Sequence, residues 1–399
     1  MEDNYTLLIP ILSDGLEFNK LTEKEYILCN QAYKHYLKIN CEVYDIIKLI
    51  DGKTNFKIIT SKFSDKTGKE ISVEYVYKLI YENLTKYGIL KGFDNYVIPY
   101  KKPEYLNLSF TIFNDRILAK FVKFFYFLFN KRVAIIALFF SLTLILTLLS
   151  LNIDLYKSFN LQESLIYFVI VMVFSVTFHE IGHATSASFF GAKHGGIGGG
   201  FYLFTPVYYA DVTDIWRLSK TQRVIVNLSG MYFELIFCTF LAISSFIFNQ
   251  ELLMIISIFV CLHSLFNLNP FLRSDGFWIL SDLTNKPNLF LHSSEKVKDL
   301  FRFIHGKKVI WSRLDFFLFL YGLSNLILIA LFLYYVLFQN TNSIIFFPKN
   351  LLTFFSSLAN DNSETSVISI GRLIVPGIFY LMLFNLIKPM IRKLWLKIK

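Results

Sequence analysis

The stretch Phe178-His179-Glu180-Ile181-Gly182-His183-Ala184 ends an apolar run that begins near Ser164. On a helix, residues four positions apart share a face, so His179 and His183 can point at one ion. Imidazole nitrogen is a common zinc ligand, and Glu180 is placed to take a proton from water. The H-E-x-x-H pattern is typical of a helical zinc site. In a soluble zinc enzyme such a helix lines a solvent-filled cleft. Here the motif comes directly after a run rich in Val, Phe, Ile and Met.

The composition indicates an integral membrane protein. Of 399 residues, 54% are hydrophobic and 18% aromatic, and the mean hydropathy is +0.47, values above those of ordinary soluble domains. We attribute the net charge of +10 to a basic cytoplasmic face and expect no nucleic-acid partner. The four cysteines have no paired spacing, which argues against a disulfide framework and a zinc knuckle; they are Cys29, Cys41, Cys238 and Cys261.

Long apolar runs predict a multi-pass α-helical membrane protein with about six spans, each of roughly 20 residues. The predicted spans are residues 133–151, 165–189, 224–248, 252–271, 316–338 and 373–391. Lys and Arg are concentrated in alternate connecting segments, which marks those segments as cytoplasmic. We therefore expect a protein of the bacterial cell membrane with both termini in the cytoplasm.

The first 105 residues predict a soluble α+β domain of winged-helix-like type. Two β-prone runs, 25–30 and 35–40, predict a hairpin, and three helices are expected at 42–50, 55–63 and 73–87. Such a domain can bind a peptide by adding a strand to its hairpin edge. A purely structural role and DNA binding are the alternatives, although no helix shows a concentrated basic face.

The remaining chain divides into four predicted parts. Residues 106–132 form a junction with a strand at 105–113 and an amphipathic helix at 117–129 that suits the membrane interface. Residues 133–282 form the membrane core with the histidine motif. Residues 283–314 are a basic cytoplasmic loop, and residues 315–399 hold the last spans and a basic tail.

A second polar cluster, Asn267-Leu-Asn-Pro-Phe-Leu-Arg-Ser-Asp275-Gly276, ends the fourth predicted span. A catalytic zinc takes three protein ligands and a water, and Asp275 supplies a carboxylate oxygen. Pro270 breaks the helix and Gly276 permits a tight turn, so the backbone can bend toward the second span. The charge bias places His183 and Asp275 at the same cytoplasmic depth.

These two motifs together resemble the site-2 protease family of intramembrane zinc metalloproteases. The stretch 204–234 resembles its branch in bacteriocin and modified-peptide gene clusters, and the N-terminal domain resembles the precursor-peptide recognition domain related to the pyrroloquinoline-quinone chaperone. The resemblance implies one zinc ion per chain, held by His179, His183 and Asp275, with Glu180 as general base. It also implies that Asn267 binds the scissile carbonyl or its oxyanion, a role that Asn269 could share or take over.

Three further features have two interpretations each. Glu234 in the third span and His263 one turn before Asn267 are candidates to orient a zinc ligand, or else ordinary buried polar residues. The aromatic stretch 201–209 could offer a strand edge to an unwound substrate, whereas the glycine-rich Gly195–Gly200 before it could simply be a flexible loop.

The expected activity is hydrolysis of peptide bonds in a ribosomally made precursor peptide, in its leader or in a membrane-embedded segment, for maturation or export. An exporter or a peptide-modifying enzyme is the expected further partner, beside the lipid bilayer. Two alternatives stay open. One is a non-proteolytic membrane component that only binds the peptide for export or immunity, and the other is a regulatory protease that cuts a membrane-tethered regulator.

Overall fold

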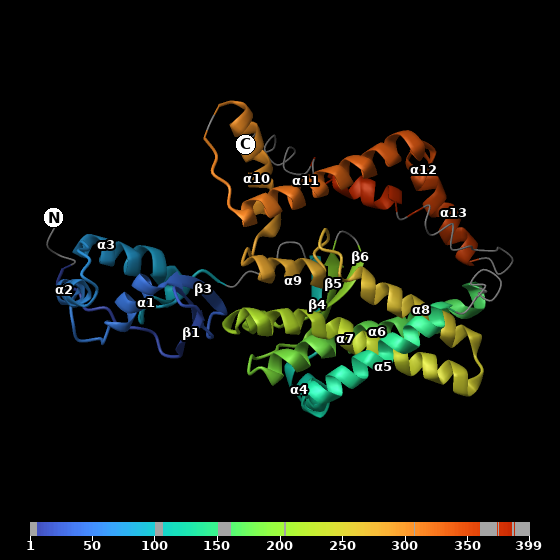
Figure 1. The fold of residues 1–399 in the computed structure, drawn as a ribbon, viewed down its shortest axis with the longest axis horizontal. Helices are drawn as coiled ribbons and strands as arrows, with labels where there is room; N and C mark the ends of the chain where they lie inside the picture. The colour runs from blue at the N-terminus through green and yellow to red at the C-terminus, as the bar shows by residue number, and fades with distance from the viewer. Residues whose placement is uncertain are drawn as a thin grey trace.

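The structure is a computed structural model, and it describes residues 6–99, 107–150, 161–202, 205–306, 308–359, 373, 375–384 and 387. An N-terminal domain with a three-stranded sheet lies at one end of a helical body (Figure 1). A second three-stranded sheet lies among the helices of that body. The protein is therefore mostly helical, with a small sheet in each part.

The N-terminal sheet has the strand order β1-β2-β3 and is antiparallel; its strands are β1 (Leu16–Thr22), β2 (Glu25–Asn30) and β3 (His35–Asn40). The hairpin of β2 and β3 has the predicted bounds, and Lys34 in its turn has a φ of 55°. Strand β1 was not predicted, because Asn19, Lys20 and Thr22 give it no clear apolar alternation.

Three helices follow the sheet, close to the predicted positions: α1 (Cys41–Lys48), α2 (Phe56–Thr67) and α3 (Val73–Tyr77), which continues as η1 (Lys78–Leu84) and η2 (Thr85–Tyr87). Asn40, Asn55 and Ser72 cap their N-termini by accepting backbone hydrogen bonds. Phe56 and Ile80 are fully buried in the core between these helices. A short turn of helix, η3 (Asp94–Tyr96), ends the domain.

Four helices of the described residues are long and apolar enough to cross a membrane. They are α5 (Lys131–Ser150), α6 (Leu161–Phe189), α7 (Lys220–Phe248) and α11 (Arg313–Tyr334), which continues as η6 (Tyr335–Gln339). These helices coincide with the first, second, third and fifth predicted spans. Figure 1 shows α5, α6 and α7 side by side.

The fourth predicted span, 252–271, extends five residues beyond the end of the observed helix at Phe266. Helix α8 (Glu251–Phe266) has 16 residues, and the chain then turns through 267–274 before α9 (Asp275–Thr284) begins. Pro270 cannot donate the backbone hydrogen bond that would continue the helix. The sixth predicted span, 373–391, lies partly outside the described residues, which contain a shorter apolar helix at Val375–Phe384.

The second sheet has the antiparallel order β4-β5-β6, with β4 (Asn107–Phe113), β5 (Ile197–Tyr202) and β6 (Thr205–Ala210). The glycine run 198–200 is part of the central strand, so the flexible-loop interpretation is wrong for these residues, while Gly195 and Gly196 precede the strand. In the stretch 201–209, which could offer a strand edge, the described residues form the end of β5 and most of β6. A Cβ at Gly198 would lie 2.7 Å from the Tyr209 ring and 2.8 Å from the Phe110 carbonyl oxygen, and only glycine permits that approach.

The other helices connect or flank these elements. The predicted helix 117–129 is present as α4 (Asp115–Phe124) and η4 (Phe125–Phe129). The remaining helices are η5 (Thr213–Arg217), α10 (Leu289–Ile304), α12 (Thr341–Ile345) and α13 (Phe347–Ala359).

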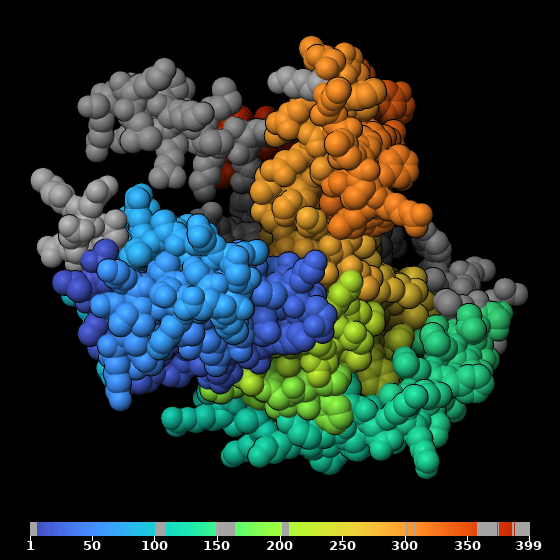
Figure 2. Space-filling view, turned by 60° about the vertical axis from the view of Figure 1, so that its left-hand side comes forward, coloured from blue at the N-terminus to red at the C-terminus, as the bar shows by residue number. Residues whose placement is uncertain are grey.

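The N-terminal domain rests on the segment between β6 and α7 (Figure 2). The Tyr36 hydroxyl donates to Oδ1 of Asp214 at 2.9 Å, and the Lys34 ammonium lies 3.0 Å from Oδ2 of Asp211. Arg217 similarly lies 3.0 Å from a carboxylate oxygen of Glu17. Polar contacts therefore join the β1-β2-β3 sheet and its β2–β3 turn to the helical body.

Candidate metal centre

Two histidines and one aspartate meet at the junction of α6 and α9. The Nε2 atoms of His179 and His183 are 3.1 Å apart. Oδ2 of Asp275 lies 2.9 Å from Nε2 of His179, and Oδ1 lies 3.3 Å from Nε2 of His183. Both histidines are buried. The structure thus brings together the three side chains that the sequence analysis names as ligands.

The hydrogen bonds of the rings define which nitrogens carry protons. Nδ1 of His179 donates to Oε2 of Glu234 at 3.1 Å, and Nδ1 of His183 donates to the Val226 carbonyl oxygen at 2.8 Å. Since both partners are acceptors, the proton of each neutral ring is on Nδ1. Both Nε2 lone pairs therefore face the Asp275 carboxylate, whose buried Oδ2 has no hydrogen-bond partner in the described chain. Lone pairs this close repel one another unless a cation lies between them.

Zinc fits this donor set. Zinc–ligand bonds of about 2.0–2.1 Å in a tetrahedron put neighbouring donor atoms roughly 3.3 Å apart, and the three observed separations are 2.9, 3.1 and 3.3 Å. Glu180 adds a fourth possible donor, since His179, Glu180 and His183 each offer an atom within 4.8 Å of the others. Two imidazoles and a carboxylate are also donors that zinc prefers.

Gly230 of α7 has no side chain, and the tips of the His179 and His183 rings occupy the space beside it. A Cβ at this position would overlap Nε2 of both His179 and His183. Gly182 of α6 has a similar role in packing, because a Cβ there would meet the Ser229 carbonyl oxygen at 2.5 Å. The Ser229 hydroxyl donates to the Gly182 carbonyl oxygen at 3.0 Å. Small residues therefore let α6 and α7 approach closely beside the site.

Glu180 lies beside the histidines and is held by the second sheet. Its Oε2 accepts a 2.6 Å hydrogen bond from the backbone amide of Ala210, the last residue of β6. Glu180 is 7% exposed. The carboxylate is thus fixed between the helix of the motif and the end of an edge strand.

Glu234 of α7 is fully buried and accepts hydrogen bonds from three side chains. Nδ1 of His179 donates to one oxygen, while Nδ1 of His263 at 2.7 Å and the Ser175 hydroxyl at 3.1 Å donate to the other. The two residues that the sequence analysis names as candidates to orient a ligand are therefore in one cluster with His179. This cluster fixes the orientation of the His179 ring.

The two asparagines of the turn after α8 differ in their contacts. Oδ1 of Asn269 accepts from the Phe271 amide at 2.9 Å, so this side chain closes its own turn. The Asn267 side chain makes no hydrogen bond to the described residues, and its backbone oxygen accepts from the Gly276 amide at 2.8 Å. That backbone bond holds the turn directly beside Asp275.

The far end of α9 is tied to α7 by a buried ion pair. Nε of Arg223 donates to Oδ1 of Asp282 at 2.6 Å, and the Asn227 amide donates to Oδ2 at 3.0 Å. Burial raises the pKa of the Asp282 carboxyl, although Arg223 and Asn227 oppose that effect. Helix α7 therefore holds α9 at one end, while its Val226 and Glu234 hold the two histidines.

Several of these groups were not predictable from the sequence. Three of them depend on contacts between segments distant in the sequence, so no local sequence pattern indicates them. They are the Val226 carbonyl, the Ala210 amide and the Arg223–Asp282 pair. Gly230 did have such a pattern, since an isolated glycine within an apolar helical run indicates close packing.

The comparisons with known proteins agree with this chemistry. The chain is 31% identical over 207 residues to a protein of Bacillus subtilis (strain 168) described as "Putative peptide zinc metalloprotease protein YydH". The match covers 79% of that relative and 49% of this chain. No protein-family model matches the sequence, and no solved structure matches the chain significantly. On the strength of the shared sequence, the chain belongs to the family of peptide zinc metalloproteases.

Proposed function

We propose that the protein is an intramembrane zinc endopeptidase that cuts a ribosomally made precursor peptide. The observation that carries the proposal is the convergence of two unprotonated Nε2 atoms, on His179 and His183, with the Asp275 carboxylate. His179, His183 and Asp275 would hold one zinc ion per chain. The name of the relative, a peptide zinc metalloprotease, supports the same activity.

Bound zinc would supply a Lewis acid that activates water and polarises the scissile carbonyl. Glu180 would take the proton from the attacking water and return it to the leaving amine. Its hydrogen bond from Ala210 fixes the carboxylate in place for both transfers. The Asn267 amide would donate to the oxygen on which negative charge develops, and its freedom from other hydrogen bonds in the described chain suits that task.

The substrate would bind as an extended strand beside β6. This strand is at the edge of the second sheet, and an extended peptide can pair with the unpaired groups of such an edge. Its last residue, Ala210, contacts Glu180, so a peptide on β6 would pass the proton acceptor. A transmembrane helix would have to unwind locally before it could bind in this way.

The four long apolar helices support a site within the membrane. The proposed topology places both termini and the N-terminal domain in the cytoplasm of a bacterial cell. The N-terminal domain would hold the leader of the precursor, and an exporter or a peptide-modifying enzyme would act on the same peptide.

A comparison of the wild-type chain with the Glu180→Gln variant tests the proposal. Each would be purified in detergent and incubated with the precursor peptides encoded beside its gene, and the products identified by mass spectrometry. The proposal predicts cleavage at a defined bond by the wild-type chain alone. Equal cleavage by both chains would refute the mechanism, and binding without cleavage would favour a non-proteolytic role.

A further inference from the structure

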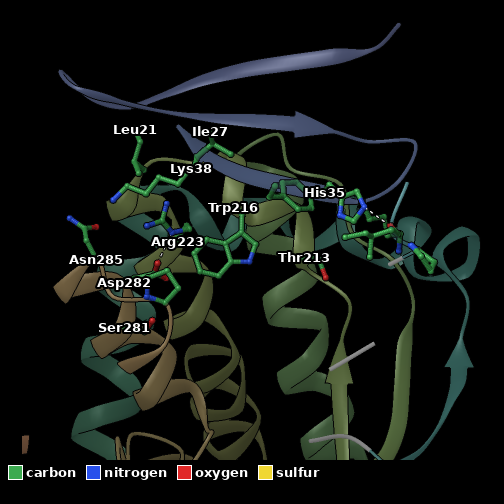
Figure 3. A pocket seen from close by; sticks show the side chains of 15 residues that line it. Leu21, Ile27, His35, Lys38, Thr213, Trp216, Arg223, Ser281, Asp282 and Asn285 are labelled. Carbon is green, nitrogen blue, oxygen red and sulfur yellow. Dashed lines mark hydrogen bonds and ion pairs between the residues drawn. The ribbon is translucent and has the colours of Figure 1, made fainter. Parts of the chain in front are cut away.

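Two cavities differ in how the charges around them are paired. One, of about 480 Å³, lies between the N-terminal sheet and the helical body (Figure 3). Each lysine and arginine in its lining has a carboxylate oxygen within 3.0 Å: the pairs are Lys34 with Asp211, Lys38 with Glu25, and Arg223 with Asp282. The other cavity, of about 260 Å³, lies between α4 and α6, and the basic side chains beside it have no such partners in the described chain. The second cavity therefore has charge to offer a ligand.

This second cavity, the α4–α6 groove, is apolar. Helix α4 contributes Ile117, Leu118 and Phe121, and α6 contributes every third or fourth residue from Phe174 to Ile181. Among the described residues that line it, Thr177 has the only polar side chain, and its hydroxyl donates to the Val173 carbonyl oxygen of its own helix at 2.7 Å. The groove therefore suits an occupant without polar groups.

A row of basic side chains borders the groove. Arg116, Lys120 and Lys123 are four and three residues apart on α4, so they share one face of the helix. Each is followed directly by an exposed apolar residue. All three are exposed, and none makes an ion pair with a residue that the structure describes. The stretch 116–132 also holds no acidic residue, and its five basic residues are Arg116, Lys120, Lys123, Lys131 and Arg132.

The groove extends away from this basic end of the helices. The rings of Phe129 and Phe189 are stacked with centroids 5.5 Å apart, so the start of α5 and the end of α6 lie at one level. From Ile181 to Phe174 the groove runs along α6 away from that level, over about 10 Å. This length is within the ~15 Å of hydrocarbon that one leaflet of a membrane provides. A lipid acyl chain extends from its headgroup in the same way.

The volume and polarity of the groove favour an acyl chain over a peptide. A helix about 10 Å wide would fill roughly 800 Å³ over this length, which is far more than the 260 Å³ of the groove. An extended peptide would bring backbone N–H and C=O groups against walls whose one polar side chain already bonds to its own helix. An acyl chain is narrow and has no such groups.

We propose that the α4–α6 groove binds an anionic phospholipid, with one acyl chain in the groove and the phosphate against Arg116, Lys120 and Lys123. A basic cluster directly before a membrane span attracts anionic headgroups. Phe178 and Ile181 line the groove and adjoin His179 and Glu180 in the sequence, so the lipid would hold α4 against α6 beside the candidate metal centre. The proposal requires α6 to lie in a membrane, but not that the chain cuts peptides.

Photo-crosslinking of the full-length wild-type chain in a neutral detergent tests the site. The probe is phosphatidylglycerol with a diazirine in one acyl chain, and its counterpart is phosphatidylcholine with the same chain. Phosphatidylglycerol should label residues 113–121 or 174–181, and phosphatidylcholine should label them several times less. Equal labelling by the two lipids, or labelling spread evenly over α5 and α11, would overturn the proposal.

Charge variants test the headgroup contacts. The double variant Lys120→Gln/Lys123→Gln should raise the phosphatidylglycerol concentration needed for half-maximal labelling, by about fivefold for each lysine. The control Lys57→Gln/Lys62→Gln removes the same charge from exposed positions on α2 of the N-terminal domain, and it should label like the wild type. Equal weakening in both double variants would contradict the assignment.

A second pair of variants tests the acyl-chain contacts. Phe121 in the groove and Phe140 on α5 are 54% and 53% exposed, so replacing either by alanine removes a similar apolar surface. Phe121→Ala should weaken labelling by about fivefold, the effect of losing roughly 40 Å² of apolar contact. Phe140→Ala should have no effect. Equal labelling of the two variants would place the acyl chain elsewhere and overturn the proposal.

Competition distinguishes the lipid from a peptide occupant. A Leu/Ala transmembrane peptide added in excess should leave the labelling of the groove by phosphatidylglycerol unchanged. Loss of that labelling would assign the groove to a peptide and overturn the proposal. Labelling as expected, in a chain that cuts no peptide, would leave the lipid site standing and refute only the proteolytic function.

Discussion

The backbone amide of Ala210 donates a 2.6 Å hydrogen bond to Oε2 of Glu180. This bond connects the edge strand β6 to the helix that carries the histidine motif. A peptide that pairs with β6 would therefore lie beside the carboxylate. The contact therefore links the strand edge at which a substrate could bind to Glu180, the proposed proton acceptor.

Glu180→Gln should lower kcat by about 10²–10⁴-fold, the usual contribution of a positioned proton acceptor. The glutamine keeps an oxygen that can accept from the Ala210 amide, so the fold and zinc content should not change. Peptide cleavage and metal analysis of the same preparation check this. Retention of more than a tenth of the wild-type rate would contradict the role of Glu180.

Gly230→Ala should abolish zinc binding, because the added Cβ would occupy the space at Nε2 of His179 and His183. Alanine stabilises a helix by up to about 1 kcal/mol relative to glycine, so the loss should not come from the helix itself. Ser244→Ala, at the far end of the same helix, is the control. Full zinc content in Gly230→Ala would show that the ion binds elsewhere.

Glu234→Gln should weaken zinc binding by about 10–100-fold, as is usual when a group that orients a metal-bound histidine is replaced. The amide of the glutamine would face one of the donors that now approach Glu234, from His179, His263 or Ser175. Competition with a chelator measures the affinity. An unchanged affinity would mean that the cluster does not orient His179.

Asn267→Ala should mainly lower the rate of cleavage, whereas Asn269→Ala should mainly lower the stability of the chain. Loss of a donor to the developing oxyanion lowers kcat by about 10²–10³-fold, and we expect this for Asn267. Asn269 closes its own turn, so its replacement should lower stability by about 1 kcal/mol and affect catalysis less. Rates and thermal unfolding of both variants test the distinction, and the opposite pattern would assign the catalytic role to Asn269.

Asp282→Asn should destabilise the chain by about 3–5 kcal/mol, because it leaves the buried Arg223 without its charged partner. The double variant Arg223→Met/Asp282→Leu removes both charges and should recover most of that loss. Thermal unfolding in the same detergent compares the three chains. A double variant as unstable as Asp282→Asn would mean that the ion pair itself is required.

The sequence predicted those parts of the fold that depend on local patterns. The β2–β3 hairpin, the helices of the N-terminal domain and the four long apolar helices follow from periodicity, caps and length. Pro270 also indicated the break after α8, although the predicted span extended beyond it. The glycine run 198–200 was ambiguous, because its strand forms only where Phe110 and Tyr209 approach from both sides.

The candidate site was predictable where spacing alone brings residues together, as with His179 and His183 on one helical face. Asp275 required a second motif and an argument about membrane depth. The Ala210 amide and the Val226 carbonyl were not predictable, because every residue carries such groups and only the packed structure selects them.

The zinc content of the purified chain tests the central claim most directly. Plasma mass spectrometry should find one zinc ion per chain in the wild type and in Glu180→Gln, and much less in His179→Ala and in Asp275→Ala. A wild-type chain without zinc, or the same zinc content in all four chains, would contradict the proposed metal centre.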